Sequence, residues 1–283
     1  MKKRTCFLLI VLMMNFCFPF AQGEESVKPE TGKQIAAKMT VPKSRSVWNT
    51  ERGYGNLSET LQTPVPTDDS EKEELQYFLF LPENYNTEEK KTFPLLLFLH
   101  GAGERGDDLE KVKFHGPPKL LAANEELRKR CPFIVVSPQC RENHYWSPAQ
   151  LLFFLDQLET NHRVDKNRVY VTGLSMGGFG TWMLTAYAGD RFAAAAPVCG
   201  GLNPVNADKL VNMPIWAFHG ESDPTVPVKS TIDAVEAVKK LGGEKIKMTL
   251  YPNVGHDSWT QTYDNLELYK WFLGYKRTEK SAP

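Results

Sequence analysis

A serine lies between two glycines in the run Gly-Leu-Ser-Met-Gly at residues 173–177. The run follows an apolar, β-branched stretch at residues 168–172 and precedes a helix-favouring stretch that begins at Gly178. This order predicts a strand, a sharp turn and a helix. Glycines beside the serine remove Cβ atoms that would collide in the turn, and the helix N-terminus directs free N–H groups toward it. Ser175 is therefore a candidate nucleophile.

A serine hydroxyl becomes an effective nucleophile when a base takes its proton and an acid orients that base. Asp223 and His256 each follow a different apolar run near the C-terminal end of the chain. An isolated Asp-Pro pair more often only starts a turn, and Glu221 is the nearest rival for the acid. The joint placement after three runs favours Ser175, Asp223 and His256 as nucleophile, acid and base, and this order along the chain is the one expected for an α/β-hydrolase.

The negative charge that forms during such a reaction needs N–H donors already aimed at it. The N–H of Met176, at the start of the predicted helix, is the first candidate. The second is expected in the loop His-Gly-Ala-Gly at residues 100–103, where Ala102 is our first choice and Gly103 the second. A plain glycine turn is the alternative reading of this loop.

Short apolar runs alternate with helical patterns from residue 75 onward. The predicted strands are Leu75–Leu81, Pro94–His100, Phe133–Ser137, Val169–Thr172, Ala193–Cys199, Pro214–His219 and Lys247–Tyr251. The predicted helices are Pro117–Arg130, Pro148–Asn161, Gly177–Ala188, Val228–Leu241 and Asp264–Tyr275. Continuously apolar strands indicate burial on both faces, so we expect an α/β fold, a mostly parallel doubly wound sheet with helices on both faces. Ligands should bind beyond the carboxyl ends of its strands.

The N-terminus has the pattern of a cleavable signal peptide. Three basic residues precede an apolar run from Cys6 to Phe20 that is shorter than a membrane span, and cleavage is expected after Gly23. An uncleaved anchor is the alternative. The mature chain would be secreted or periplasmic, with 31 basic and 34 acidic residues because three of the 34 basic ones lie in the leader. This balance does not favour nucleic acid as a partner, and no later run is long enough for membrane insertion.

The domain organisation follows from these patterns. We expect a signal peptide at 1–23, an N-terminal extension at 24–74, a catalytic domain at 75–275 and a short tail at 276–283. Within the extension, Ala36–Trp48 is a candidate edge strand, and the proline-broken, charged stretch 63–74 is expected to be a loop.

Three cysteines remain after cleavage. Cys131 and Cys140 bracket one predicted strand and are too far apart for a disulfide. Cys140 and Cys199 both follow strands and could meet at one sheet edge, although buried free thiols are the more common outcome.

The chain resembles secreted α/β-hydrolase serine esterases of the phospholipase/carboxylesterase and dienelactone-hydrolase-like type. It is also similar to the poly(hydroxybutyrate)-depolymerase and feruloyl/acetyl-xylan esterase group. The stretches that carry the resemblance are LLLFLHGAGERGDD, FIVVSPQC, VYVTGLSMGGFGTW, WAFHGESDPTVP and GHDSW. The resemblance implies serine-dependent hydrolysis of carboxylic esters through an acyl-enzyme, with no cofactor. Dienelactone hydrolases proper carry a cysteine nucleophile, so Ser175 is a departure from them.

The substrate is constrained by loop length and by aromatic residues. Only residues 200–213 join two consecutive predicted strands after the nucleophile helix, too few for a large lid. The candidate substrate contacts are Trp259, Trp146 and Gly103. An open site with aromatic side chains suits soluble or polysaccharide-linked esters with acetyl, feruloyl or short acyl groups. We expect no metal, because no cluster of His, Asp and Glu has ligand spacing. A serine peptidase resembling prolyl oligopeptidase and a noncatalytic binding protein remain as alternatives.

Overall fold

One eight-stranded sheet forms the centre of the molecule. The computed structural model describes residues 28–44 and 67–277, so the predicted signal peptide and tail residues 278–283 lie outside the described residues. The spatial order is β1-β2-β4-β3-β5-β6-β7-β8, in which β1 and β2 run antiparallel to their neighbours and the other strands are parallel. The strands are β1 Gln34–Ser44, β2 Thr67–Phe80, β3 Phe93–Leu99, β4 Ile134–Pro138, β5 Val164–Leu174, β6 Ala194–Val198, β7 Ile215–Gly220 and β8 Ile246–Tyr251.

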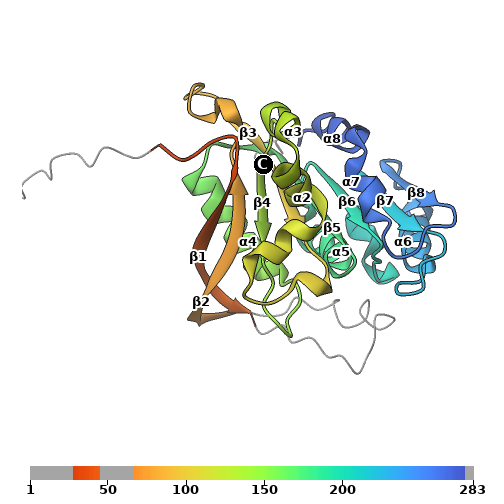
Figure 1. The fold of residues 1–283 in the computed structure, drawn as a ribbon. Helices are drawn as coiled ribbons and strands as arrows, with labels where there is room; N and C mark the ends of the chain where they lie inside the picture. Colours follow the sequence, from red (N-terminus) through yellow and green to blue (C-terminus); the bar gives the residue numbers. More distant parts are fainter. Residues whose placement is uncertain (1–27, 45–66, 278–283) are drawn as a thin grey trace, which may run out of the picture.

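Helices cover both faces of the sheet (Figure 1). Side chains of α4, α5 and α6 belong to one buried cluster, and side chains of α2, α7 and α8 belong to the other. The helices are α2 Gly116–Ala123, α3 Glu125–Arg130, α4 Pro148–Asn161, α5 Met176–Ala188, α6 Lys229–Lys240, α7 Trp259–Asp264 and α8 Leu266–Leu273. This confirms the expected α/β-hydrolase fold, with a mostly parallel, doubly wound sheet.

The strand β3 shows why continuous apolar runs predict such a sheet. All seven of its residues are buried. Leu95, Leu97 and Leu99 join the cluster on one face, whereas Leu96 and Phe98 join the cluster on the other. Because successive side chains of a strand point to opposite faces, only a sheet covered on both sides buries every residue of the run.

The N-terminal part of the chain contains more sheet than the sequence predicts. The predicted edge strand is present as β1, and the part of that prediction beyond Ser44 lies outside the described residues. The predicted loop is wrong from residue 67 onward, because residues 67–74 are the first half of β2 and pair with β1. Lysines on β1 face acids on β2 here, with Lys38 2.7 Å from Glu74 and Lys43 2.6 Å from Glu71. Exposed residues of opposite charge can form paired strands at the edge of a sheet. The strand at residues 67–74 is therefore recognised only from its pairing with β1.

Two predicted helices are each interrupted by an asparagine. The predicted helix 117–130 divides into α2 and α3 at Asn124, and the predicted helix 264–275 is replaced by α7 and α8 with Asn265 between them. Both asparagines have extended backbones, and their side chains accept hydrogen bonds from the backbone N–H groups of Leu127 and Glu267. An asparagine that caps a new helix competes with continuation of the old one, which explains both breaks.

The loop that would carry a lid is short. Between β6 and β7 lies the 3-10 helix η7 Pro204–Leu210, so no large lid is inserted here, as expected. Cys131, Cys140 and Cys199 are all free thiols. Among the described residues, no helix has the length and apolar character that crossing a bilayer requires.

Candidate active site

Ser175 occupies the turn between β5 and α5 in a strained conformation. Its φ of 52° and ψ of −116° lie in a region that residues other than glycine rarely adopt. Its N–H lies 3.0 Å from the carbonyl of Val198 and 3.2 Å from the Sγ of Cys199, which ties the turn to the end of β6. Strain of this kind persists because neighbouring structure holds it, and it fixes the direction of the hydroxyl.

The glycine after the nucleophile allows the helix to approach the sheet. A Cβ on Gly177 would lie 1.9 Å from the carbonyl oxygen of Leu99 and 2.7 Å from that of His100. Both atoms belong to the backbone and cannot rotate away. The sequence Gly-x-Ser-x-Gly is therefore required here by contact between α5 and the end of β3, as well as by the turn itself.

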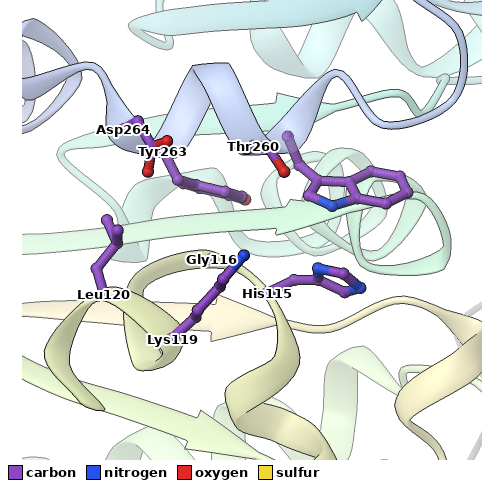
Figure 2. Close-up of a pocket in the computed structure, with 8 residues that line it drawn as sticks. His115, Gly116, Lys119, Leu120, Thr260, Tyr263 and Asp264 are labelled. Atoms are coloured by element: carbon purple, nitrogen blue, oxygen red, sulfur yellow. The ribbon is translucent and has the colours of Figure 1, made fainter. Parts of the chain in front are cut away.

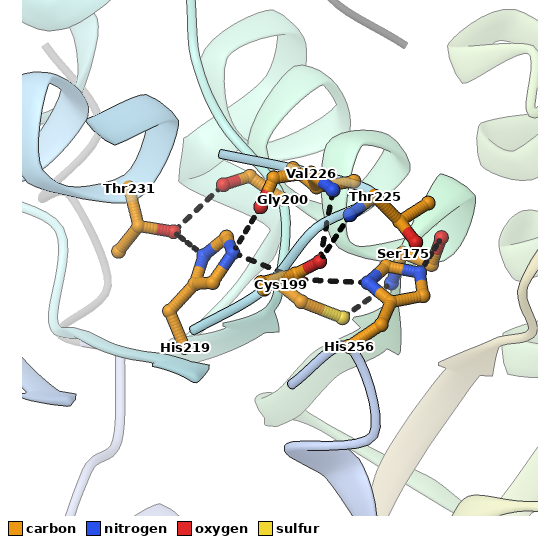
Figure 3. Close-up of polar contacts among 9 residues, drawn as sticks. Ser175, Cys199, Gly200, His219, Thr225, Val226, Thr231 and His256 are labelled. Carbon is orange, nitrogen blue, oxygen red and sulfur yellow. Dashed lines mark hydrogen bonds and ion pairs between the residues drawn. The ribbon is translucent and has the colours of Figure 1, made fainter. Parts of the chain in front are cut away.

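The structure brings together the three residues that the sequence favours. Nε2 of His256 is 3.0 Å from Oγ of Ser175, and Nδ1 of His256 is 2.7 Å from Oδ2 of Asp223 (Figure 3). The other carboxylate oxygen, Oδ1, accepts hydrogen bonds from the N–H groups of Thr225 at 2.8 Å and Val226 at 2.9 Å. The imidazole therefore joins a serine hydroxyl to a carboxylate that is itself held by the backbone.

The Asp223 carboxylate is fully buried and ionised. Its side chain is 0% exposed. Burial alone would raise its pKa, but hydrogen bonds from His219, His256 and the N–H groups of Val226 and Thr225 outweigh burial and hold the pKa well below the usual range. Glu221, the rival candidate, is exposed, and it is Asp223 that reaches His256.

The two backbone N–H groups that the sequence favours as donors, those of Met176 and Ala102, lie at the starts of helical segments. Met176 begins α5 directly after Ser175, and Ala102 begins the 3-10 helix η4 Ala102–Glu104 directly after the end of β3. Among the described residues, neither N–H donates to another protein group. Gly103, the second choice, is exposed, and a Cβ on it would meet no atom within 4 Å.

The cysteine beside the nucleophile completes a set of groups that could surround a metal ion. One ligand atom from each of Cys199, Asp223 and His256 lies within 4.8 Å of the others. Both oxygens of Asp223 already accept protein N–H groups. Burial raises the pKa of the Cys199 thiol far above its usual value, so the thiol stays protonated and is a poor ligand. This donor set fits a hydrogen-bonded triad better than a metal centre.

Of the two tryptophans proposed as substrate contacts, one is buried in the core. Trp146 is 3% exposed, its Nε1 donates to the carbonyl of His100 at 3.1 Å, and its ring packs edge-on against His100. Trp146 therefore does not lie at the surface, where a substrate contact was predicted. The neighbouring Tyr145 is also buried, and Phe179 and Trp182 pack in the core. A residue after a strand can turn inward, and its sequence position does not show which way it turns.

Trp259 lies beside the imidazole of His256. Its ring is 5.1 Å from that of His256 and nearly perpendicular to it, and 5.2 Å from the ring of His115. Trp259 and His115 also line a small cavity where the start of α2 faces α7, and Figure 2 shows His115 and Lys119 opposite Thr260 there. Sequence patterns do not place His115 near this site, because nothing local links residue 115 to residue 259.

His100 is 1% exposed and forms two hydrogen bonds with the backbone. Its Nε2 accepts from the N–H of Cys140 at 2.9 Å, so Nδ1 carries the proton and donates to the carbonyl of Gly101 at 2.6 Å. Burial is the main reason that the pKa of this imidazole falls to about 4, and the charge of Arg105 lowers it further. His100 is a neutral tautomer that fixes the loop carrying Ala102.

This buried imidazole predicts a loss of stability in mild acid. Between about pH 6.5 and 4 the unfolded chain takes a proton at His100 and the folded chain does not, so the free energy of unfolding falls as pH falls. The full effect is about 3 kcal/mol. Urea unfolding at several pH values measures it, and His100→Asn should be less stable overall yet show a flatter dependence on pH. Equal slopes in the two proteins would contradict the assignment.

Comparison with known proteins agrees with this geometry. Residues 148–277 match the dienelactone hydrolase family. This part of the chain is therefore similar to that family. The matched residues include α5, β7 and β8, which lie next to Ser175, Asp223 and His256 in sequence.

Three similar proteins have names that refer to esterases. A bifunctional acetylxylan esterase/xylanase of Neocallimastix patriciarum is 37% identical over 142 residues, which are 46% of this chain and 19% of that protein. A probable feruloyl esterase C of Aspergillus flavus is 25% identical over 217 residues, 74% of this chain and 77% of that one. A solved thermostable esterase superposes with a TM-score of 0.64 at 33% identity, covering 74% of this chain and 61% of that structure. The chain thus spans less than a fifth of the first of these relatives.

Proposed function

We propose that this protein is a serine-dependent carboxylic ester hydrolase with Ser175 as nucleophile, His256 as general base and acid, and Asp223 as the group that orients the base. The observation that carries the proposal is the position of His256, with one ring nitrogen 3.0 Å from Ser175 and the other 2.7 Å from Asp223. Names of similar proteins support an esterase, and the family match supports a hydrolase.

The reaction follows from the hydrogen bonds. Oγ of Ser175 attacks the carbonyl carbon of the ester while its proton passes to Nε2 of His256. The tetrahedral intermediate expels the alcohol, which takes that proton, and leaves an acyl group on Ser175. Water then attacks the acyl carbon with His256 again as base, releasing the carboxylic acid and restoring the hydroxyl. Asp223 stays ionised and stabilises the imidazolium in both halves.

The N–H groups of Met176 and Ala102 are proposed to bind the oxygen that becomes negative in the intermediate. Met176 follows Ser175 at the start of α5, Ala102 begins η4 after the end of β3, and neither N–H has a protein acceptor within the described chain. Donors that are fixed before the reaction stabilise this charge without reorganisation, and one such donor is typically worth about 10²- to 10³-fold in kcat.

The proposed substrates are soluble or polysaccharide-linked esters with acetyl, feruloyl or short acyl groups. The short connection between β6 and β7 supports an open site that a polymer chain can reach. Trp259, beside His256, supplies an aromatic surface for a sugar or a phenolic acyl group. The acetylxylan and feruloyl esterases among the similar proteins favour the same class. Export by a signal peptide at residues 1–23 belongs to this proposal.

A panel of substrates tests the proposal. We expect turnover of p-nitrophenyl acetate and of acetylated xylan or methyl ferulate, and none of a proline-containing peptide amide, because ester alcohols leave more easily than amines. The series of p-nitrophenyl esters of rising chain length ranks the acyl groups. Preference for the peptide amide would replace the esterase by a peptidase, and absence of all turnover in folded protein would favour a binding protein.

A further inference from the structure

His219 is a buried residue at the end of β7, and both nitrogens of its ring meet oxygen atoms (Figure 3). Its side chain is 0% exposed. The sequence indicates only a packing role for this residue. In the structure it contacts the carboxylate that orients His256, so its protonation state affects the proposed triad.

The Nε2 atom of His219 must carry a hydrogen. It lies 2.9 Å from the carbonyl oxygen of Val226 and 3.2 Å from Oδ2 of Asp223. A carbonyl oxygen has no hydrogen to donate, and neither has a carboxylate. The Nε2–H group is therefore shared between these two acceptors.

The Nδ1 atom must carry a hydrogen as well. It lies 2.7 Å from Oγ1 of Thr231, and the same Oγ1 lies 2.7 Å from the carbonyl oxygen of Gly200. A hydroxyl has one hydrogen, and the carbonyl of Gly200 can only accept. The threonine hydrogen therefore belongs to the Gly200 bond, and Nδ1–H of His219 donates to the threonine oxygen.

We propose that His219 is a doubly protonated positioning residue whose positive charge partners the buried Asp223 carboxylate. A fully buried carboxylate needs an opposite charge or several donors, and Asp223 then has both. Two series of contacts join His219 to Ser175. One runs through Thr231 to Gly200, the neighbour of Cys199, whose Sγ accepts the Ser175 N–H. The other runs through Asp223 to His256 and then to the Ser175 hydroxyl.

The positive charge of His219 should affect the proposed ester hydrolysis. The kinetic part of this inference therefore rests on the proposed function. A positive His219 offsets much of the charge of Asp223, which weakens the attraction between that carboxylate and a positively charged His256. The other titratable groups near the pair are the protonated Cys199 thiol and the exposed Asp257. Neither changes when His219 is replaced. The residue therefore extends activity toward lower pH.

Two substitutions separate charge from position. His219→Gln keeps an N–H near the Nε2 position and removes the charge. Thr231→Val removes the acceptor of Nδ1–H with little change of shape, so the ring should become neutral. In both variants the acid limb of the kcat/KM profile for p-nitrophenyl acetate should move up by about one pH unit. His219→Ala should also lower kcat about 10- to 100-fold with KM unchanged, the loss typical of removing a group that holds an active-site ligand.

Nuclear magnetic resonance tests the proton count independently of any activity. Nitrogen-15-labelled wild-type protein near neutral pH should show two ring N–H signals that are lost in His219→Gln. A matched control is His162→Gln, since His162 lies before β5, at the opposite end from Ser175, and should leave kinetics and the two signals unchanged. A single ring N–H for His219, or acid limbs that stay in place in both variants, would overturn the proposal. An inactive wild-type protein with two signals would instead remove only the esterase and the kinetic consequence.

Discussion

Ser175→Ala should reduce hydrolysis of p-nitrophenyl acetate by about 10⁴-fold or more while the fold stays intact. In the proposed mechanism the Ser175 hydroxyl attacks the ester, and among the described residues it is the hydroxyl that lies within hydrogen-bond distance of the His256 imidazole. The remaining rate would come from binding and the N–H donors alone. Steady-state kinetics measure the loss, and circular dichroism with thermal unfolding establishes that the variant is folded.

A second variant at position 175 separates the effect of losing the hydroxyl from the effect of relieving the backbone strain. Ser175→Gly should be as inactive as the alanine variant but more stable, by about 1 kcal/mol, because glycine adopts a φ of 52° at little cost. Alanine keeps the strain and should unfold near the wild-type temperature. Retained turnover in either variant would remove Ser175 from the mechanism.

Gly177→Ala should cause the largest loss of stability among single-methyl changes at this site. The added Cβ would lie 1.9 Å from the Leu99 carbonyl oxygen and 2.5 Å from the carbonyl carbon. Relief requires α5 to move away from β3, at a cost of about 3 kcal/mol or more. That movement also displaces Ser175 and the Met176 N–H, so the surviving folded protein should lose at least about 10² in kcat/KM.

The control for this change is another glycine with space around it. A Cβ on Gly189, after the end of α5, would meet no atom within 4 Å. Gly189→Ala should therefore unfold at the wild-type temperature with wild-type kinetics. If Gly177→Ala also behaved like wild type in both measurements, the close approach of α5 to β3 would be wrong.

The elements that were predicted well from the sequence are those decided by residues close together along the chain. The run Phe93–Leu99 is apolar throughout and is a buried central strand, and Pro148–Asn161 is a helix with the predicted bounds. The turn around Ser175 is specified by its glycines. In each case the residues that decide the structure are neighbours in sequence, so periodicity and steric demands are visible without knowledge of the fold.

Contacts between distant segments explain the predictions that were wrong. The charged residues 67–74 belong to a strand that pairs with β1, and Lys38 and Lys43 of β1 form ion pairs with its Glu74 and Glu71. Trp146 turns inward because its indole N–H meets the carbonyl of His100. Neither partner is near in sequence, so composition alone favoured a loop in one case and a rim position in the other.

The sequence by itself determined the parallel part of the sheet, the turn at Ser175 and the identity of the serine, imidazole and carboxylate that meet at the edge of the sheet. Strand ends of a parallel sheet lie together, so order along the chain was enough to select them. Tertiary structure alone decided the groups behind them, above all His219 against Asp223 and the Cys199 thiol beneath Ser175. Those contacts depend on how side chains from β6, β7 and α6 pack in three dimensions, and a one-dimensional pattern contains no such distances.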